Sequence, residues 1–344
     1  MKTRQVFPLL AWVALSLSPK IHAAVEVATD PVGFVSISVP ADSDAVLAVP
    51  LYRTPVFRGV IQSISGNVVT VSASANWVAD QFKQVTPTQN DTFAALIATG
   101  DAENNGKEGM IGKITANGTN TLTVQLDQDD TFAGVKTETS NPGAGDQIDV
   151  MAYWTPASLL GTSLPNGVQL LLFPTNQAGI NIRSQTTLTM TAGAWTNGAE
   201  NANNLQLFFG QGFVLRNATA SPQVVSMVGS VPMATHRYVL RKNSSTGTAQ
   251  DIRIGYTSPV PEIIGNLKVG FTPGDQLLVF DNAAAGKNKS SVKTLVYSGS
   301  FWYDGAVNVT TSFKLQPGQG YIFRRAPSAS AGATVWATMQ SYLR

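Results

Sequence analysis

QLLLFPTNQAGINIRSQTTLTMTAGAWTNG at residues 169–198 and QLLVFDNAAAGKNKSSVKTLVYSGSFWYDG at residues 276–305 are two versions of one pattern. The spacing is 276 − 169 = 107 residues, and it aligns the tryptophan and the final glycine of each stretch. One inserted residue later, GQGFVLRNA at 210–218 meets GQGYIFRRA at 318–326 with a spacing of 108. A repeat this regular indicates a chain built from two related units, although it names no ligand and no reaction.

Most of the remaining sequence alternates apolar and polar residues with a period of two, as half-buried strands do. FVSISV at residues 34–39 is one such segment. VIQSISGNVVTVS at 60–72 and GMIGKITANGTNTLTVQL at 109–126 each hold a Gly/Asn turn between two strand-like runs, which predicts two hairpins. We therefore expect an all-β fold of antiparallel sandwich or barrel-like modules with an internal duplication.

The repeat and the change of pattern before it give the expected layout of the chain. A signal peptide is expected over residues 1–23 and an N-terminal antiparallel β module over 24–146. Repeat unit 1 is expected over 147–233, a connecting segment over 234–251 and repeat unit 2 over 252–344.

The first residues have the order of parts that a secretory signal peptide needs. Lys2 and Arg4 precede an apolar run at residues 6–17, and Ala23 ends a small-residue junction. The run is shorter than the roughly 20 residues that span a bilayer. We expect export and a location in the periplasm, at the cell surface or outside the cell, with no transmembrane segment in the mature chain.

Charge and cysteine content exclude several classes of protein. Without the three basic residues of the leader, 23 − 3 = 20 basic residues face 21 acidic ones, a formal net charge of −1. This balance predicts no general attraction to nucleic acid. The chain has no cysteine, which excludes disulfides, thiolate metal sites and cysteine nucleophiles.

Several stretches together resemble a known group of proteins. They are DPVGFVSISVPADSDAVLAVPL at residues 30–51, EGMIGKITANGTNTLTVQLDQDD at 108–130, GDQLLVFDNAAAGKNKS at 274–290 and the second GQG segment. The chain is similar in these to an uncharacterised family of exported β-proteins that occurs in large paralogous sets in bacteria of the Verrucomicrobia group. The resemblance covers nearly all of the chain after the leader. It implies export and expansion by duplication, and it brings no catalytic residues.

Catalytic residue sets are scarce in this sequence. His236 is the one histidine left after the leader, and no GxSxG motif accompanies it. We expect it to lie on the surface or at a strand end. The six glutamates stand in no recognisable acid/base setting, although paired carboxylates of a glycoside hydrolase are usually distant in sequence. We predict no catalytic residue and no enzymatic activity.

Calcium is the one metal that the composition allows, because it binds through oxygen ligands alone. Asp101 and Glu103 begin one acidic loop, and Asp127, Asp129 and Asp130 form a second after a predicted strand. Two acidic loops near one hairpin are candidates to share an ion. The alternative is that both are solvated loops. No other cofactor is expected.

The repeated tryptophans have two interpretations. Trp195 and Trp302, with Tyr303 and Asp304, are candidates for a sugar site, because such sites use exposed aromatic platforms beside polar groups. The alternative, which we favour, is that both tryptophans cap the interior of their units. Exposure of the two rings decides between the two.

These observations predict a non-enzymatic exported protein, a structural or binding component at the cell surface or in the periplasm. One alternative is a carbohydrate-binding or polysaccharide-active protein, with surface glycans or other envelope proteins as partners. A second is an outer-membrane β-barrel, against which the short strands broken by Pro and Gly argue.

Overall fold

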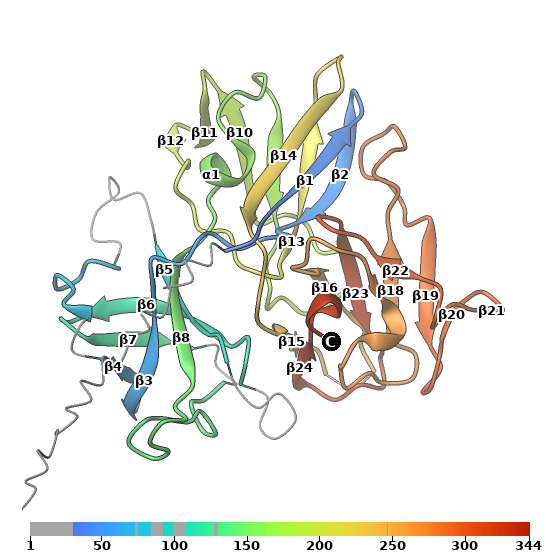
Figure 1. Cartoon of the computed structure of the whole chain (residues 1–344). Coiled ribbons are helices and arrows are strands. Elements are labelled where there is room, and N and C mark those ends of the chain that lie inside the picture. The colour runs from blue at the N-terminus through green and yellow to red at the C-terminus, as the bar shows by residue number, and fades with distance from the viewer. Residues whose placement is uncertain (1–29, 73–74, 84–91, 100–106, 127–129, 246) are drawn as a thin grey trace, which may run out of the picture. The chain divides into compact units, whose positions relative to one another are not determined.

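The computed structural model describes residues 30–72, 75–83, 92–99, 107–126, 130–245 and 247–344. These residues form antiparallel sheets and a closed barrel (Figure 1), which confirms the predicted all-β class. The helices named within the described ranges are short: α1 (Pro156–Leu160), η2 (Ile264–Asn266) and η3 (Ser341–Leu343). No helix in the described ranges is long and apolar enough to cross a membrane. The expected signal peptide lies outside the described residues, and all of the strands belong to the compact unit from Pro31 onward.

Six strands close into an antiparallel barrel in the order β3-β4-β7-β6-β5-β8. They are β3 (Phe57–Ser65), β4 (Val68–Val71), β5 (Phe93–Ile97), β6 (Ile111–Asn117), β7 (Thr121–Gln125) and β8 (Gln147–Ala152). The two predicted hairpins are β3–β4 and β6–β7, and they meet through β4 and β7. Alternate side chains point inward, so that Val69, Val71, Leu122 and Val124 are all buried in the core of the barrel.

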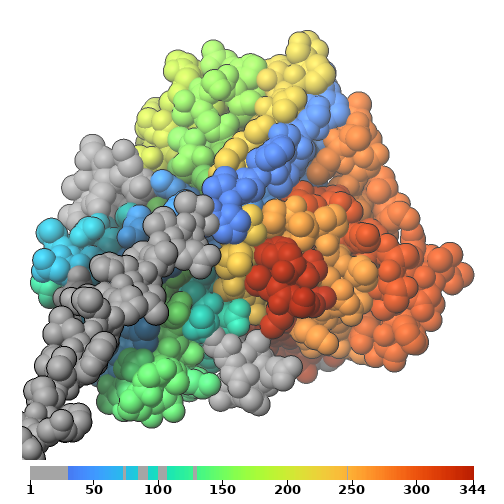
Figure 2. All heavy atoms as spheres, viewed as in Figure 1, coloured from blue at the N-terminus to red at the C-terminus, as the bar shows by residue number. Residues whose placement is uncertain are grey.

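A second group of strands, which we call copy 1, comprises residues 32–48 and 153–230. Its six-stranded sheet has the order β12-β11-β10-β9-β13-β2, and β1 pairs with β14 in a separate two-stranded sheet. The strands are β1 (Val32–Val39), β2 (Ser43–Ala48), β9 (Gln169–Leu172), β10 (Thr186–Thr191), β11 (Ala194–Asn197), β12 (Glu200–Asn201), β13 (Gly212–Asn217) and β14 (Gln223–Ser230). Figure 2 shows β1 in blue directly beside β14 in yellow, although the two are far apart in the sequence.

The third group, copy 2, comprises residues 236–338. Its six-stranded sheet has the order β16-β23-β18-β19-β20-β21, with two-stranded pairs β15–β24 and β17–β22. The strands are β15 (His236–Lys242), β16 (Gln250–Gly255), β17 (Glu262–Ile263), β18 (Gln276–Val279), β19 (Lys293–Tyr297), β20 (Trp302–Asp304), β21 (Val307–Asn308), β22 (Lys314–Leu315), β23 (Gly320–Arg325) and β24 (Gly332–Thr338).

The two six-stranded sheets have the same strand order. Starting from β2, the first sheet runs β2-β13-β9-β10-β11-β12, and each strand has its counterpart in β16-β23-β18-β19-β20-β21. In the first strand the spacing between counterparts is larger than elsewhere. Ala48 pairs with Gly212 and Gly255 pairs with Gly320, so the spacing there is 255 − 48 = 207 residues.

Strand pairing divides the chain differently from the boundaries expected from the sequence. Residues 32–48, expected in the N-terminal module, pair with β14 and β13 of copy 1. Residues 236–242, expected in the connecting segment, form β15 and pair with β24. β8, expected to begin repeat unit 1, closes the barrel against β3 and β5. An alternating pattern identifies a strand but does not say which distant strand it pairs with. The barrel is thus inserted into copy 1, between β2 and α1.

Candidate functional site

The loop after β9 of copy 1 is hydrogen-bonded to β16 of copy 2, and the loop after β18 of copy 2 is hydrogen-bonded to β2 of copy 1. The Gly179 carbonyl of copy 1 accepts a hydrogen bond from the Asp251 N–H of copy 2 at 2.9 Å. The Gly286 carbonyl of copy 2 accepts one from the Asp44 N–H of copy 1 at 3.0 Å. The same contact is therefore made twice, in opposite directions, between residues related by the repeat.

Each of these aspartates also forms an ion pair within its own copy. Asp44 accepts hydrogen bonds from Nε and Nη2 of Arg216 at 2.7 and 2.9 Å. Asp251 accepts the equivalent bonds from Arg324 at 2.6 and 3.1 Å. The bond to the carboxylate raises the pKa of each guanidinium. Bidentate pairing of this kind fixes both side chains in one geometry.

Each of these carboxylates also accepts a hydrogen bond from a backbone N–H of the opposite copy. The Asn288 N–H donates to Asp44 at 2.7 Å, and the Asn181 N–H donates to Asp251 at 2.8 Å. Both asparagines have a left-handed backbone, with φ of 50° and 54°. Asparagine tolerates this conformation better than most residues, which explains why it stands at the same place in both loops.

The repeated Gly-Gln-Gly segments hold the two copies in contact. The Gly255 N–H donates to the Gly210 carbonyl and the Ala48 N–H to the Gly318 carbonyl, both at 2.9 Å. Gly210 and Gly318 have φ of 73° and 71°, as expected for a tight turn. A β-carbon on Gly320 would lie 2.5 Å from the Leu47 carbonyl oxygen, so the approach of the two backbones requires glycine there.

These repeated aspartates, arginines, asparagines and glycines therefore serve the contact between the copies. Its reciprocal pattern matches that of an isologous dimer interface, in which each contact occurs twice. Here both partners belong to one chain.

A groove of about 710 Å³ opens between the two copies. Its deepest side chains are apolar and each is less than one tenth exposed; we call them the apolar floor, and they are Val46, Phe173, Val214, Leu278, Phe280 and Ile322. Residues 181–184 and 288–291, from the two crossing loops, line the sides. The volume is within the range of small-molecule sites in proteins, about 300–1,000 Å³.

Five cationic side chains line this inter-copy groove. They are Arg183, Arg216, Arg253, Arg324 and Lys289. Two carboxylates, Asp44 and Asp251, are paired with two of them. One of the lining residues named for the groove, Asp44, is acidic, while Asp251 and Asp281 act on the cations from beside it. The groove combines an apolar surface with an excess of positive charge.

Arg253 is the cation closest to the apolar floor. Its guanidinium carbon lies 3.5 Å from the centre of the Phe173 ring, and the side chain is half-buried. Burial lowers the pKa of Arg253 to about 10, and the charge of Asp251 opposes part of that shift. Stacking on the ring recovers some of the lost hydration energy.

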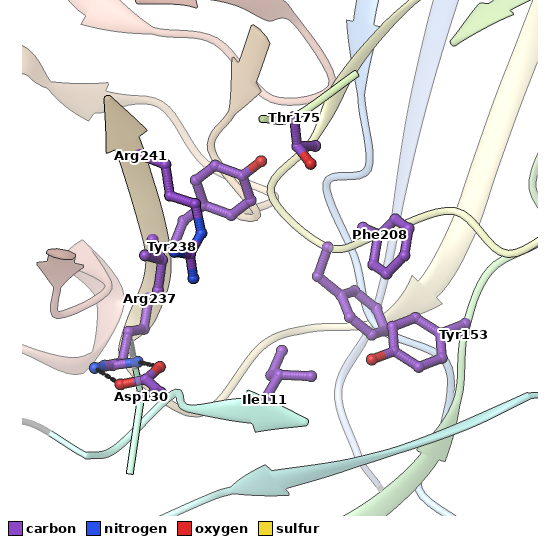
Figure 3. A pocket seen from close by; sticks show the side chains of 10 residues that line it. Ile111, Asp130, Tyr153, Thr175, Phe208, Arg237, Tyr238 and Arg241 are labelled. Atoms are coloured by element: carbon purple, nitrogen blue, oxygen red, sulfur yellow. Dashed lines mark hydrogen bonds and ion pairs between the residues drawn. The ribbon is translucent and has the colours of Figure 1, made fainter. Parts of the chain in front are cut away.

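A second, smaller cavity of about 190 Å³ is shown in Figure 3. Tyr153 and Tyr238 line it, together with Arg241 and the ion pair between Arg237 and Asp130. Burial raises the pKa of both tyrosines, that of Tyr238 to about 12, so both remain neutral phenols at neutral pH. Tyr153 points its hydroxyl toward the centre of the cavity (Figure 3).

The candidate sugar platform does not form a surface. Trp195 is fully buried and Trp302 is 2% exposed, each in the core of its own copy. The Trp195 indole N–H donates to the Gly161 carbonyl at 2.9 Å. Tyr303 is partly buried beside Trp302, and Asp304 forms an ion pair with Lys293. The rings therefore have the core position that the second interpretation gave them, and the exposure that a sugar platform needs is missing.

Four of the five calcium candidates, Asp101, Glu103, Asp127 and Asp129, lie outside the described residues. The fifth, Asp130, accepts a hydrogen bond from Arg237 Nη2 at 2.6 Å and lies 3.6 Å from the ammonium group of Lys107. Two cations thus already neutralise this carboxylate. Within the described ranges, no three His, Asp or Glu side chains gather as a metal site would require.

His236 begins β15 and is buried, not on the surface. It packs between the rings of Tyr256 and Trp336, at 5.0 and 4.4 Å between ring centres. Its Nδ1 accepts a hydrogen bond from the Thr257 N–H at 3.4 Å. Burial lowers the pKa of His236 to about 3, so the ring is neutral and serves as an aromatic core residue.

The sequence pattern alone did not identify the groove or Arg253. The sequence did hold a signal for two other cations of the groove: the repeat aligns Lys289 with Ile182 and Arg183 with Ser290, so each cation has an uncharged counterpart. Comparisons with protein-family models, with curated proteins and with solved structures found no match for the chain.

Proposed function

We propose that the chain is an exported, non-enzymatic binding protein whose ligand lies in the inter-copy groove. The observation that carries the proposal is the groove of about 710 Å³ between the copies, which has an apolar floor and a cationic lining. The aspartates, arginines, asparagines and Gly-Gln-Gly segments that recur in both copies hold the copies together. Other repeated residues, such as Phe173 and Phe280, line the groove, together with positions where the copies differ, such as Arg253.

Export in this proposal rests on the sequence of residues 1–23 and on the resemblance to exported β-proteins. The two copies pair within one chain, so the groove forms without a partner chain. Binding rests on the size of the groove and on its apolar floor, since ligand pockets are mostly apolar with a few polar groups.

The test is recovery of a bound compound from the full chain produced in a bacterial host. The expected product is found outside the cytoplasm, has an intact mass that corresponds to a start at Ala24, and releases a small molecule on solvent extraction. Ser184→Trp combined with Ser291→Trp fills the groove, because both serines line it. This variant should release none of the compound. Ser300→Trp, on an exposed loop outside the groove, is the matched control and should behave as the parent.

Two results would contradict the proposal. One is retention of the protein in the cytoplasm with the leader uncleaved. The other is turnover by the purified protein on a panel of glycoside, peptide and ester substrates.

A further inference from the structure

Each cation of the inter-copy groove can be compared with the residue at the matching position of the other copy. Arg216 and Arg324 are counterparts at a spacing of 108, and both are paired with an aspartate. The other three have uncharged counterparts: Arg253 matches Val46 (253 − 46 = 207), Lys289 matches Ile182 (289 − 182 = 107) and Arg183 matches Ser290 (290 − 183 = 107). The reciprocal hydrogen bonds between the copies use charged residues that recur in both, and the three unmatched cations take no part in them.

None of the three unmatched cations has a carboxylate partner in the part of the chain that the structure describes. Arg253 lies on the ring of Phe173. Lys289 donates to the carbonyls of Asp281 and Ala284 at 2.6 and 2.9 Å, and burial lowers its pKa. Arg183 stands exposed at the edge of the groove. The nearby charges of Asp251 and Asp281 offset only part of the cost of burying Arg253 and Lys289, and an anion bound in the groove would offset more.

The geometry of Arg253 leaves its hydrogen-bonding edge available. A guanidinium has five N–H donors in one plane. When its face stacks on a ring, those donors point outward around the ring edge. The Arg253 nitrogens make no hydrogen bond within the described residues and do not belong to the buried atoms without a partner, so they face the groove. A carboxylate there could accept two parallel hydrogen bonds.

We propose that the inter-copy groove binds an amphipathic organic anion, with its acidic group at Arg253 and its apolar body on the floor between Phe173 and Phe280. The inference rests on the proposed function and specifies its ligand class. Arg183 and Lys289 add long-range attraction for the anion. The paired Arg216 and Arg324 are already neutralised and keep the groove in shape.

The test uses the full chain and dodecanoate, measured by isothermal titration calorimetry below its micelle concentration. Dodecylammonium has the same apolar body with the opposite charge, and it should bind at least about 10-fold more weakly. Arg253→Met keeps a long apolar side chain and removes the charge; it should weaken dodecanoate binding by about 10-fold or more, the value expected for a charged hydrogen bond. Lys314→Met, an equal loss of charge at an exposed position outside the groove, is the control and should change nothing.

Arg183→Gln is a second variant for the same titration. It leaves the apolar floor unchanged, because Arg183 is on an exposed loop. It should weaken dodecanoate binding severalfold and reduce the loss of affinity on addition of salt. Equal binding of dodecanoate and dodecylammonium overturns the inference. So does dodecanoate binding that is unchanged in both arginine variants, or a concentration-dependent dimer that Arg253→Met abolishes, because the groove would then take a second copy of the chain. The two tests have different measurements. The dodecanoate titration tests the ligand class, whereas the site of export and the extracted compound test the proposed function.

Discussion

Gly255→Ala would drive two β-carbons into the same space at the centre of the contact between the copies. A β-carbon built on Gly255 lies 1.8 Å from the β-carbon of Ala48, its own counterpart in copy 1. Carbon atoms in contact are about 3.5–4.0 Å apart, so β2 and β16 must separate by roughly 2 Å. That movement also stretches the reciprocal hydrogen bonds from Ala48 to Gly318 and from Gly255 to Gly210.

These terms set the expected loss of stability. Overpacking costs about 1–3 kcal/mol, and each of the two stretched hydrogen bonds adds about 1 kcal/mol, for a total of about 3–5 kcal/mol. Gly255 has no left-handed φ, so alanine introduces no backbone strain of its own. The double variant Ala48→Gly/Gly255→Ala exchanges the two residues across the contact and should recover to within about 1 kcal/mol of the parent.

The assay is urea unfolding followed by tryptophan fluorescence, because Trp195 and Trp302 report on the core of one copy each. Gly270→Ala is the matched control: the residue is exposed, and its new β-carbon would meet only a side-chain methyl of Thr334 at 3.3 Å. It should shift the free energy of unfolding by less than about 1 kcal/mol. The reasoning is refuted if Gly255→Ala unfolds like the parent, or if the exchanged double variant is no more stable than the single one.

Three further outcomes follow from the same structure. Trp302→Ala should reduce the free energy of unfolding by about 3–5 kcal/mol in urea, whereas a folded variant with lost glycan binding would contradict its role as a core residue. Asp251→Ala leaves Arg324 without its carboxylate partner; it should destabilise the fold by up to about 3 kcal/mol, and a melting temperature equal to that of the parent would argue against the ion pair. His236 has a pKa of about 3 when folded and near 6.5 when unfolded, so the unfolded state binds the extra proton in this window. Stability should therefore fall as pH drops from about 6.5 toward about 3, and His236→Gln should flatten that dependence in pH-resolved unfolding.

The sequence was sufficient for features that depend on local pattern. The two hairpins at residues 60–72 and 109–126 form as predicted, because an Asn/Gly turn between alternating runs fixes both the strands and their pairing. The repeated Gly-Gln-Gly segments form matching turns, in which Gly210 and Gly318 both have positive φ. The two repeated tryptophans lie at matching places in two cores.

Features that depend on distant pairing could not be predicted. Nothing within residues 43–48 indicates that β2 completes a sheet whose other strands begin at Gln169. The inter-copy groove could not be predicted either, because it also depends on the pairing of distant strands. Arg253 becomes notable only when its counterpart Val46 is known. That match is found from strand pairing, because β2 and β16 share little sequence.

The barrel leaves and re-enters copy 1 at a single place, since its first and last strands are neighbours: Phe57 pairs with Val150. The chain has 169 − 48 − 1 = 120 residues between β2 and β9. Between the counterparts of these strands, β16 and β18, it has 276 − 255 − 1 = 20. Copy 2 is thus a natural example of the unit without the added domain. The two ends of the barrel lie close together, as in other inserted domains. We therefore expect the paired copies to keep their architecture when the barrel is removed or replaced by another domain with adjacent ends.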